Sequence, residues 1–302
     1  MIFTSENNWY YWYYGDQPPF SRQSGNLEFR THFGKQNKPI KDFKSELTNA
    51  AESVLGFSIK PDLFFSGGVD SELMLRAFQN LKADFNVIIV RYENDYNLYD
   101  VSYAVTICNL LNVSYKLIDF NLKKFYENEC ITVSELAQID RPRALPYCKF
   151  LELSDNLPIL AGSDLYTFRT NDNYSVKGTW QSYCSEWDTG WSRYAHAINR
   201  QAIPEWLKWT PGLVVSYMNL DWYKKLINDV YYGKLGVNST KIIGYREAFP
   251  NLLERKKQTG FEKIDTLIDE VENFIQKKYN GLPYRNIHVR SLNEIYQSIM
   301  YQ

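Results

Sequence analysis

The sequence lacks a long hydrophobic run. Hydrophobic residues make up 44% of its 302 residues, but no apolar stretch approaches the roughly 20 residues that a membrane-spanning helix needs. The first six residues, Met1–Glu6, reach a charged residue early and do not have the pattern of a secretory signal peptide. We therefore expect no membrane partner and a cytoplasmic location.

Cysteine and histidine are scarce, with four and three residues respectively. No two cysteines have the C-x-x-C spacing of a zinc knuckle or a dithiol redox centre, which excludes both sites as local motifs. Most of the cysteines are expected to be buried thiols, and they are Cys108, Cys130, Cys148 and Cys184. His196 has no partner nearby in the sequence, so it is interpreted as a packed imidazole and not as a catalytic base.

An excess of charge of one sign is also absent, because the formal net charge is −1. This balance provides no global attraction to nucleic acid or to an anionic membrane. Aromatic residues are abundant, with 24 Tyr and 8 Trp, and such side chains either stack on bases or pack as amphipathic surface. We favour packing over stacking on bases, so we do not favour nucleic acid as a partner.

The most informative feature present is a glycine turn between a strand and a helix. The apolar run Leu63–Phe65 is typical of a strand buried in a parallel sheet. Beyond the turn, apolar residues recur at helical spacing, at Leu73, Met74, Ala77 and Phe78. The sequence therefore predicts that Ser66–Ser71 joins the end of a strand to the start of a helix.

A turn of this composition is suited to an anion. The first N–H groups of a helix have no internal partner, and the helix dipole adds positive charge there. Gly67 and Gly68 let backbone amides approach phosphate oxygens closely, and Ser66 and Ser71 add hydroxyl donors. The alternative is a helix cap with a glycine turn and no ligand.

Asp70 is the unexpected residue in this turn. A carboxylate beside bound phosphates repels them unless a divalent cation lies between, so Asp70 is predicted to be a Mg²⁺ ligand. The turn has no Lys after its second Gly and is not a G-x-G-x-x-G sequence, so it matches neither common nucleotide-binding glycine loop.

The segment Ser66-Gly67-Gly68-Val69-Asp70-Ser71 resembles the pyrophosphate loop of the N-type ATP pyrophosphatases, the PP-loop superfamily. That superfamily includes asparagine synthetase, GMP synthetase and NAD synthetase. The resemblance implies that all six loop residues bind ATP with Mg²⁺. It also implies that Arg91, which follows the next predicted strand, lies where the adenine and ribose bind.

Two further segments resemble asparagine synthetase-like synthase domains. Gly162-Ser163-Asp164 leaves a predicted strand and implies ATP contacts from Gly162 and Ser163 and a second Mg²⁺ ligand at Asp164. It departs from the family pattern at Leu160, Ala161 and Leu165, and an Asx turn is the alternative. In the segment 245–261, Lys256 or Lys257 is implied to neutralise the leaving pyrophosphate. A solvated charged segment is the alternative interpretation.

The order of elements predicts the fold class. Short apolar strands alternate with helices, which indicates an α/β, doubly wound, mostly parallel sheet, and the resemblance implies the adenine nucleotide alpha hydrolase-like form. Strands are expected at 63–65, 85–91, 114–120 and 157–161, and helices at 40–57, 99–111, 221–232 and 261–279. We expect a short N-terminal β element over 1–40, with a tight turn at Asn7-Asn8, an ATP-pyrophosphatase domain over 41–200 and a helical C-terminal subdomain over 201–302.

Two other groups of residues are singled out. Arg141, Arg143 and Lys149 are candidates to hold a carboxylate or phosphate, with surface charge as the alternative. The segment 178–200 is expected to be irregular and to face a substrate. The apolar stripe of the last predicted helix, 261–279, indicates core or a homodimer contact.

The resemblance implies a ligase that releases AMP and pyrophosphate. It would adenylate a carboxylate or carbonyl oxygen of a small-molecule acceptor and transfer ammonia or an amine. Ile2 stands where a glutaminase domain would carry its nucleophilic Cys, so a separate subunit is the alternative nitrogen source. Two other hypotheses stay open: a PP-loop enzyme that modifies a nucleobase of tRNA or DNA, and a non-catalytic nucleotide-binding module.

Overall fold

The computed structural model describes residues 10–15, 28–33, 39–57, 60–137, 139, 141–162, 167–168, 180–184, 186–221, 237–253, 255, 258–278 and 288–291. Within these ranges, no helix is both long enough and apolar enough to cross a membrane.

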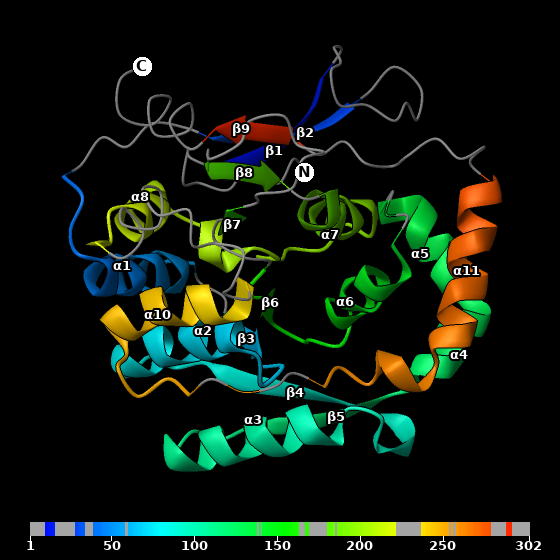
Figure 1. Cartoon of the computed structure of the whole chain (residues 1–302), viewed down its shortest axis with the longest axis horizontal. Helices are drawn as coiled ribbons and strands as arrows, with labels where there is room; N and C mark the ends of the chain where they lie inside the picture. Colours follow the sequence, from blue (N-terminus) through cyan, green and yellow to red (C-terminus); the bar gives the residue numbers. More distant parts are fainter. Residues whose placement is uncertain are drawn as a thin grey trace.

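A parallel four-stranded sheet forms the centre of the molecule (Figure 1). Its strands are β3 (Pro61–Phe64), β4 (Asn86–Tyr92), β5 (Lys116–Phe120) and β6 (Leu157–Ile159). They lie in the order β5-β4-β3-β6, so the chain moves outward from β3 to β5 and then returns to the other side of β3. The predicted α/β fold class is confirmed, and the strand order reverses between β3 and β6.

Side chains that alternate along the strands divide the core between the two faces of the sheet. Leu63 and Val87 point into one buried cluster, whereas Phe64 and Ile88 point into the other. The first cluster includes residues of α1 (Phe43–Leu55), α2 (Val69–Asn80), α3 (Leu98–Leu110), α8 (Pro211–Met218) and α10 (Val237–Ala248). These helices occupy the left and lower parts of Figure 1.

The second cluster lies under the helices on the right of Figure 1. These are α4 (Leu122–Asn128), α5 (Cys130–Ala137), α6 (Leu145–Phe150), α7 (Glu186–Ala197) and α11 (Asp265–Lys278). Short 3-10 turns complete the fold: η1 (Glu93–Asp95), η2 (Pro142–Ala144), η3 (Trp206–Lys208) and η5 (Phe261–Lys263). The sheet is therefore covered by helices on both faces, as a doubly wound fold requires.

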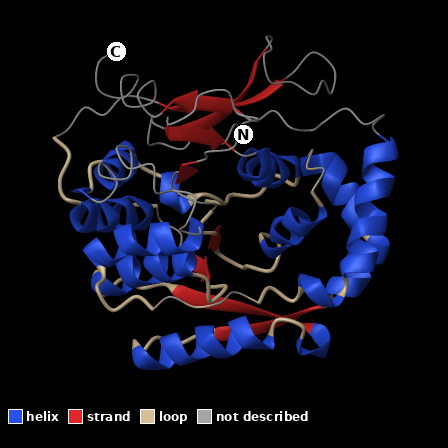
Figure 2. Cartoon of the chain, in the orientation of Figure 1, coloured by secondary structure: helices blue, strands red, loops and turns tan. Residues whose placement is uncertain are grey.

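Two small antiparallel sheets lie apart from the central one, at the top of Figure 2. One pairs β1 (Tyr10–Gly15) with β2 (Glu28–Phe33). The other has the order β7-β8-β9 and contains β7 (Thr167–Phe168), β8 (Trp180–Cys184) and β9 (His288–Ser291). The β element predicted over residues 1–40 thus contains the pair β1 and β2. The predicted turn at Asn7-Asn8 lies outside the described residues.

One prediction about local structure is wrong. The segment 178–200, expected to be irregular, contains β8 and the helix α7. Trp191, Tyr194 and Ala195 recur at helical spacing and are buried in the second core cluster. The polar residues between them obscure this periodicity in the sequence. In the structure, the three buried side chains pack α7 against the core.

The C-terminal third contributes to the same core as the α/β unit. The ring of Phe43 in α1 lies 5.4 Å from that of Tyr217 and 6.4 Å from that of Tyr245, measured between centroids. The predicted helix 261–279 begins at Asp265, after a left-handed Gly260 and the turn η5. Most of the predicted helix 221–232 lies outside the described residues, and the proposed domain boundaries stay a prediction.

Candidate active site at the carboxyl end of the sheet

The Ser66–Ser71 loop connects β3 to α2 where the strand order reverses. In open α/β sheets, ligands bind beyond the carboxyl ends of the strands at such a switch point. Gly67 has φ +73°, and a Cβ there would lie 2.4 Å from the carbonyl oxygen of Asp100. Only glycine meets both conditions without strain, so Gly67 fixes the path of the loop against the start of α3.

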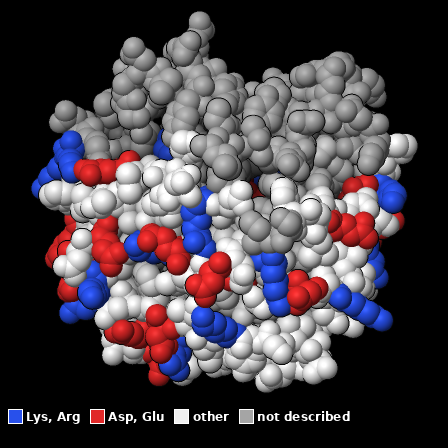
Figure 3. Space-filling view, turned by 180° about the vertical axis from the view of Figure 1, so that it is seen from behind, with Lys and Arg blue, Asp and Glu red and all other residues white. Residues whose placement is uncertain are grey.

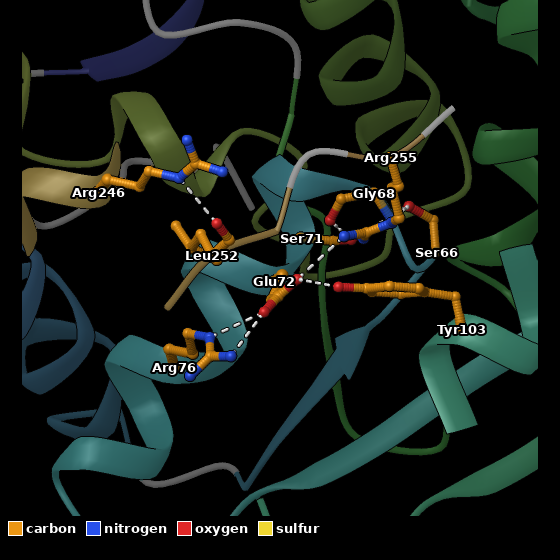
Figure 4. A network of polar contacts seen from close by, with 9 residues as sticks. All are labelled: Ser66, Gly68, Ser71, Glu72, Arg76, Tyr103, Arg246, Leu252 and Arg255. Atoms are coloured by element: carbon orange, nitrogen blue, oxygen red, sulfur yellow. Dashed lines mark hydrogen bonds and ion pairs between the residues drawn. The ribbon is translucent and has the colours of Figure 1, made fainter. Parts of the chain in front are cut away.

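Hydrogen bonds within the loop hold its hydroxyl groups together (Figure 4). The Gly68 N–H donates to Ser66 Oγ at 3.2 Å, and the Ser66 and Ser71 hydroxyl oxygens lie 3.1 Å apart. Ser71 Oγ also donates to the Gly68 carbonyl at 2.9 Å. Gly68 is the N-cap of α2 and no side chain caps this helix end, so its first amides are available to an anion.

Asp70 lies in the first turn of α2 and accepts hydrogen bonds through both carboxylate oxygens. Lys241 Nζ donates to Oδ2 at 2.6 Å, and the Tyr245 hydroxyl donates to Oδ1 at 2.8 Å. Both donors come from α10, and the side chains of Lys241 and Asp70 are 9% and 21% exposed. A lysine from 171 residues further along the chain therefore places a positive charge beside the carboxylate that we predicted to bind Mg²⁺.

This pairing changes the argument for a metal at Asp70. The sequence argument required a cation beside the carboxylate, and Lys241 removes that requirement. Within the described ranges, no three His, Cys, Asp or Glu side chains form a group that could hold a metal ion. The second predicted ligand, Asp164, lies outside the described residues, as does Ser163. Mg²⁺ is usually bound through one or two carboxylates together with substrate phosphates, so a Mg²⁺ ion at Asp70 stays a prediction.

Gly162 lies just beyond the end of β6, next to β3, and so reaches the same edge of the sheet as the loop. It has φ +88°, and a Cβ there would lie 2.9 Å from Glu205 Cα. The chain at 203–207 runs beside β6, with the Leu207 N–H donating to the Ala161 carbonyl at 3.0 Å. Gly162 therefore permits this close approach, which gives it a structural role whether or not it contacts a ligand.

Arg91 lies near the carboxyl end of β4, but its guanidinium is engaged with β5. Its Nε and Nη2 donate to the two carboxylate oxygens of Asp119 at 2.6 and 3.0 Å. This pairing raises the pKa of Arg91 and lowers the pKa of Asp119. The predicted contact of Arg91 with adenine or ribose stays a prediction. It would require the Arg91 guanidinium to donate to the nucleotide as well as to Asp119.

Two of the other basic candidates, Arg143 and Lys149, also form ion pairs. Arg143 contacts Asp265 of α11 at 2.6 Å. Lys149 contacts Glu152 at 2.8 Å and Glu129 at 3.2 Å. The structure thus places Arg143 and Lys149 among the helices of the second face, joined to acidic neighbours, rather than at the glycine loop.

The segment that follows Leu252 crosses the loop region. Arg255 Nη1 donates to Glu72 Oε2 at 3.1 Å, and the Gln258 N–H donates to Asp100 Oδ1 at 3.0 Å. Gly260 has φ +84° and lies against Tyr96, where a Cβ would approach the backbone carbon at 2.7 Å. Lys256 and Lys257 lie outside the described residues, but both of their described neighbours are bound beside the glycine loop.

A buried polar cluster around Glu72 was not predicted from the sequence. This carboxylate is fully buried, with Oε1 accepting from Arg76 Nε at 2.9 Å. Tyr103 OH lies 3.5 Å from Oε2, and its ring lies 3.5 Å below the Arg255 guanidinium carbon. The i, i+4 spacing of Glu72 and Arg76 was a readable signal. The contacts of Tyr103 and Arg255 depend on tertiary structure.

Surface charge is mixed on the face that Figure 3 shows. Lys and Arg side chains alternate with Asp and Glu over the described part of this face, without an extended area of one sign. Such a surface does not provide the continuous basic track that binds a nucleic-acid backbone.

No protein-family model matches the sequence, and no curated protein matches it. Among solved structures, the chain is similar to NMN synthetase from Francisella tularensis, with 12% identity and a TM-score of 0.31 over 71% of this chain and 96% of that chain. It is also similar to NH3-dependent NAD synthetase from Campylobacter jejuni, with 16% identity and a TM-score of 0.31 over 78% and 92%.

Proposed function

We propose that the protein is an ATP-dependent ligase that releases AMP and pyrophosphate. The observation that carries this proposal is the position of the Ser66–Ser71 loop, at the switch point of the sheet and at the uncapped N-terminus of α2. Backbone amides and the Ser66 and Ser71 hydroxyls can bind the β- and γ-phosphates there. The resemblance of this loop to the PP-loop then selects the bond between the α- and β-phosphates as the one that breaks.

In the proposed reaction, a carboxylate or carbonyl oxygen of a small-molecule acceptor attacks the α-phosphorus, and pyrophosphate leaves. Ammonia or an amine then attacks the activated carbon and displaces AMP. The protein's contribution is alignment and stabilisation of the charge that develops on the leaving group. Lys256 and Lys257 are proposed to supply part of that stabilisation, and no step is routed through a metal held by Asp70.

The products of ATP test this proposal. We expect AMP and pyrophosphate, and not ADP and phosphate, when the protein is incubated with ATP labelled at the α-phosphate, ammonium chloride and fractionated metabolites. A Ser66→Ala/Ser71→Ala variant should lose activity by about 100-fold, because two donors to the phosphates are removed. Ser102→Ala, an exposed serine of α3, is the matched control and should retain activity. Formation of ADP would contradict the proposal.

A further inference from the structure

We propose that Arg255 binds the phosphate group that the Ser66–Ser71 loop receives. Its guanidinium would bridge Glu72, at the start of α2, and an oxygen of the β,γ-pyrophosphate. This inference rests on the proposed function and adds to it a residue that neither the loop sequence nor the lysine pair indicates. Figure 4 shows the Arg255 side chain pointing toward Gly68, Ser66 and Ser71 from the segment after Leu252.

The contacts of Arg255 leave one of its nitrogen atoms unused. Nη1 donates to Glu72 Oε2 at 3.1 Å, and the side chain is only 9% exposed. Nη2 is buried and has no hydrogen-bond partner in the part of the chain that the structure describes. Burying a guanidinium nitrogen without an acceptor is unfavourable, and an anion on the loop would supply the acceptor.

The charges around Glu72 favour an additional anion. Its single carboxylate is shared by two guanidinium groups, because Arg76 binds Oε1 at 2.9 and 2.8 Å while Arg255 binds Oε2. Burial raises the pKa of Tyr103, so its hydroxyl is neutral near pH 7. The other buried carboxylate beside this segment, Asp100, accepts the Gln258 N–H, and Asp70 is paired with Lys241.

The geometry suits arginine in particular. The ring of Tyr103 lies 3.5 Å from the guanidinium carbon and fixes the plane of the group by stacking. With Nη1 bound to Glu72, the planar guanidinium group holds Nη2 in a fixed direction. Arginine binds two acceptors at once in this way. Lysine carries the same charge but cannot hold Glu72 and a phosphate oxygen in this arrangement.

Binding of inorganic pyrophosphate to the full chain tests the inference. Isothermal titration calorimetry should show binding to the wild type and a dissociation constant at least ten times higher for Arg255→Lys. Arg246→Lys is the matched control, because Arg246 Nε donates to the Leu252 carbonyl at 2.8 Å at the start of the same segment. Its dissociation constant should stay within twofold of the wild type. If Arg255→Lys lowers the melting temperature, Arg255→Gln, which retains a donor for Glu72, is measured in its place.

The outcomes separate this inference from the proposed function. If the wild type binds pyrophosphate, Ser66→Ala weakens binding and a folded Arg255 variant binds as tightly as the wild type, then Arg255 is not a phosphate ligand, while the loop assignment stands. If the wild type binds neither pyrophosphate nor ATP, both proposals are overturned. Weaker binding by the Arg255 variants with an unchanged Arg246→Lys control supports the assignment.

Discussion

At the scale of single residues, the pair formed by Asp70 and Lys241 decides the electrostatics of the loop. A lone carboxylate would oppose a phosphate bound to the first amides of α2. Lys241 donates to it at 2.6 Å from a largely buried position, and Tyr245 binds the second oxygen. The pair neutralises the carboxylate and at the same time fixes α10 to the start of α2.

This arrangement makes a prediction for Asp70→Asn. The substitution removes the carboxylate charge that lies 2.6 Å from the largely buried Lys241 ammonium, so the free energy of unfolding should fall by about 1–3 kcal/mol. Urea denaturation measures this loss. The double variant Asp70→Asn/Lys241→Gln removes both charges and should be less destabilised than the sum of the two single variants. Additive effects would contradict the coupling between Asp70 and Lys241, and an Mg²⁺-dependent stability that Asp70→Asn abolishes would support Asp70 as a metal ligand.

At the scale of elements, the connection from β3 to α2 depends on a backbone conformation that one glycine supplies. Gly67 has a positive φ and lies against the carbonyl of Asp100, so the loop and the start of α3 are positioned together. The segment after Leu252 is bound to the same two places, through Glu72 and Asp100. Three separate stretches of chain therefore meet at the N-terminus of α2.

Gly67→Ala should destabilise the protein by about 2–3 kcal/mol, because alanine is strained at φ +73° and its Cβ would clash with Asp100. The matched control is Gly56→Ala at the end of α1. Gly56 has φ −65°, and a Cβ there would lie 3.4 Å from the Ser53 carbonyl oxygen. The control should change stability by less than about 1 kcal/mol. Equal effects in guanidinium denaturation would show that the loop conformation is not required.

At the scale of the whole molecule, the two faces of the sheet form two buried clusters that share the strands between them. Cys108 lies in the first cluster, and Cys130 and Cys148 lie in the second. Because β3 and β4 contribute side chains to both clusters, opening one face should disturb the other. The thiols can report on this coupling, since burial removes them from solvent.

We predict that these three thiols do not react with Ellman's reagent at pH 8 in the folded protein. Burial raises the pKa of Cys108 to about 12 and of Cys130 to about 11, and it also raises the pKa of Cys148. All three thiols are therefore protonated at pH 8, and the unreactive thiol form favours the folded state. The stability that they contribute is complete below about pH 9, the ordinary thiol pKa, and decreases as the pH rises toward 11–12.

A Cys184→Ser variant removes the fourth thiol and makes the measurement specific. Cys108, Cys130 and Cys148 should then react only through global unfolding, at one common slow rate, and their reaction should be complete in guanidinium. A thiol in one cluster that reacts faster than those in the other would show that the two faces open separately.

The sequence alone determined the fold class and the place of the glycine loop. Both depend on local signals: apolar strands such as Leu63–Phe65, helical periodicity after the turn, and a Ser-Gly-Gly composition that predicts an anion site. The missed helix α7 shows the limit of such signals, because only burial of Trp191 and Tyr194 against the second core reveals which face of that segment matters.

Only the tertiary structure decided how the loop is surrounded. Lys241 lies 171 residues from Asp70, and Arg255 lies 183 residues from Glu72. No periodicity or spacing connects such pairs, because they form only when α10 and the segment after it fold over the carboxyl end of the sheet. The sequence indicated that a carboxylate in the loop needs a positive charge beside it, and the folded chain places its own Lys241 there.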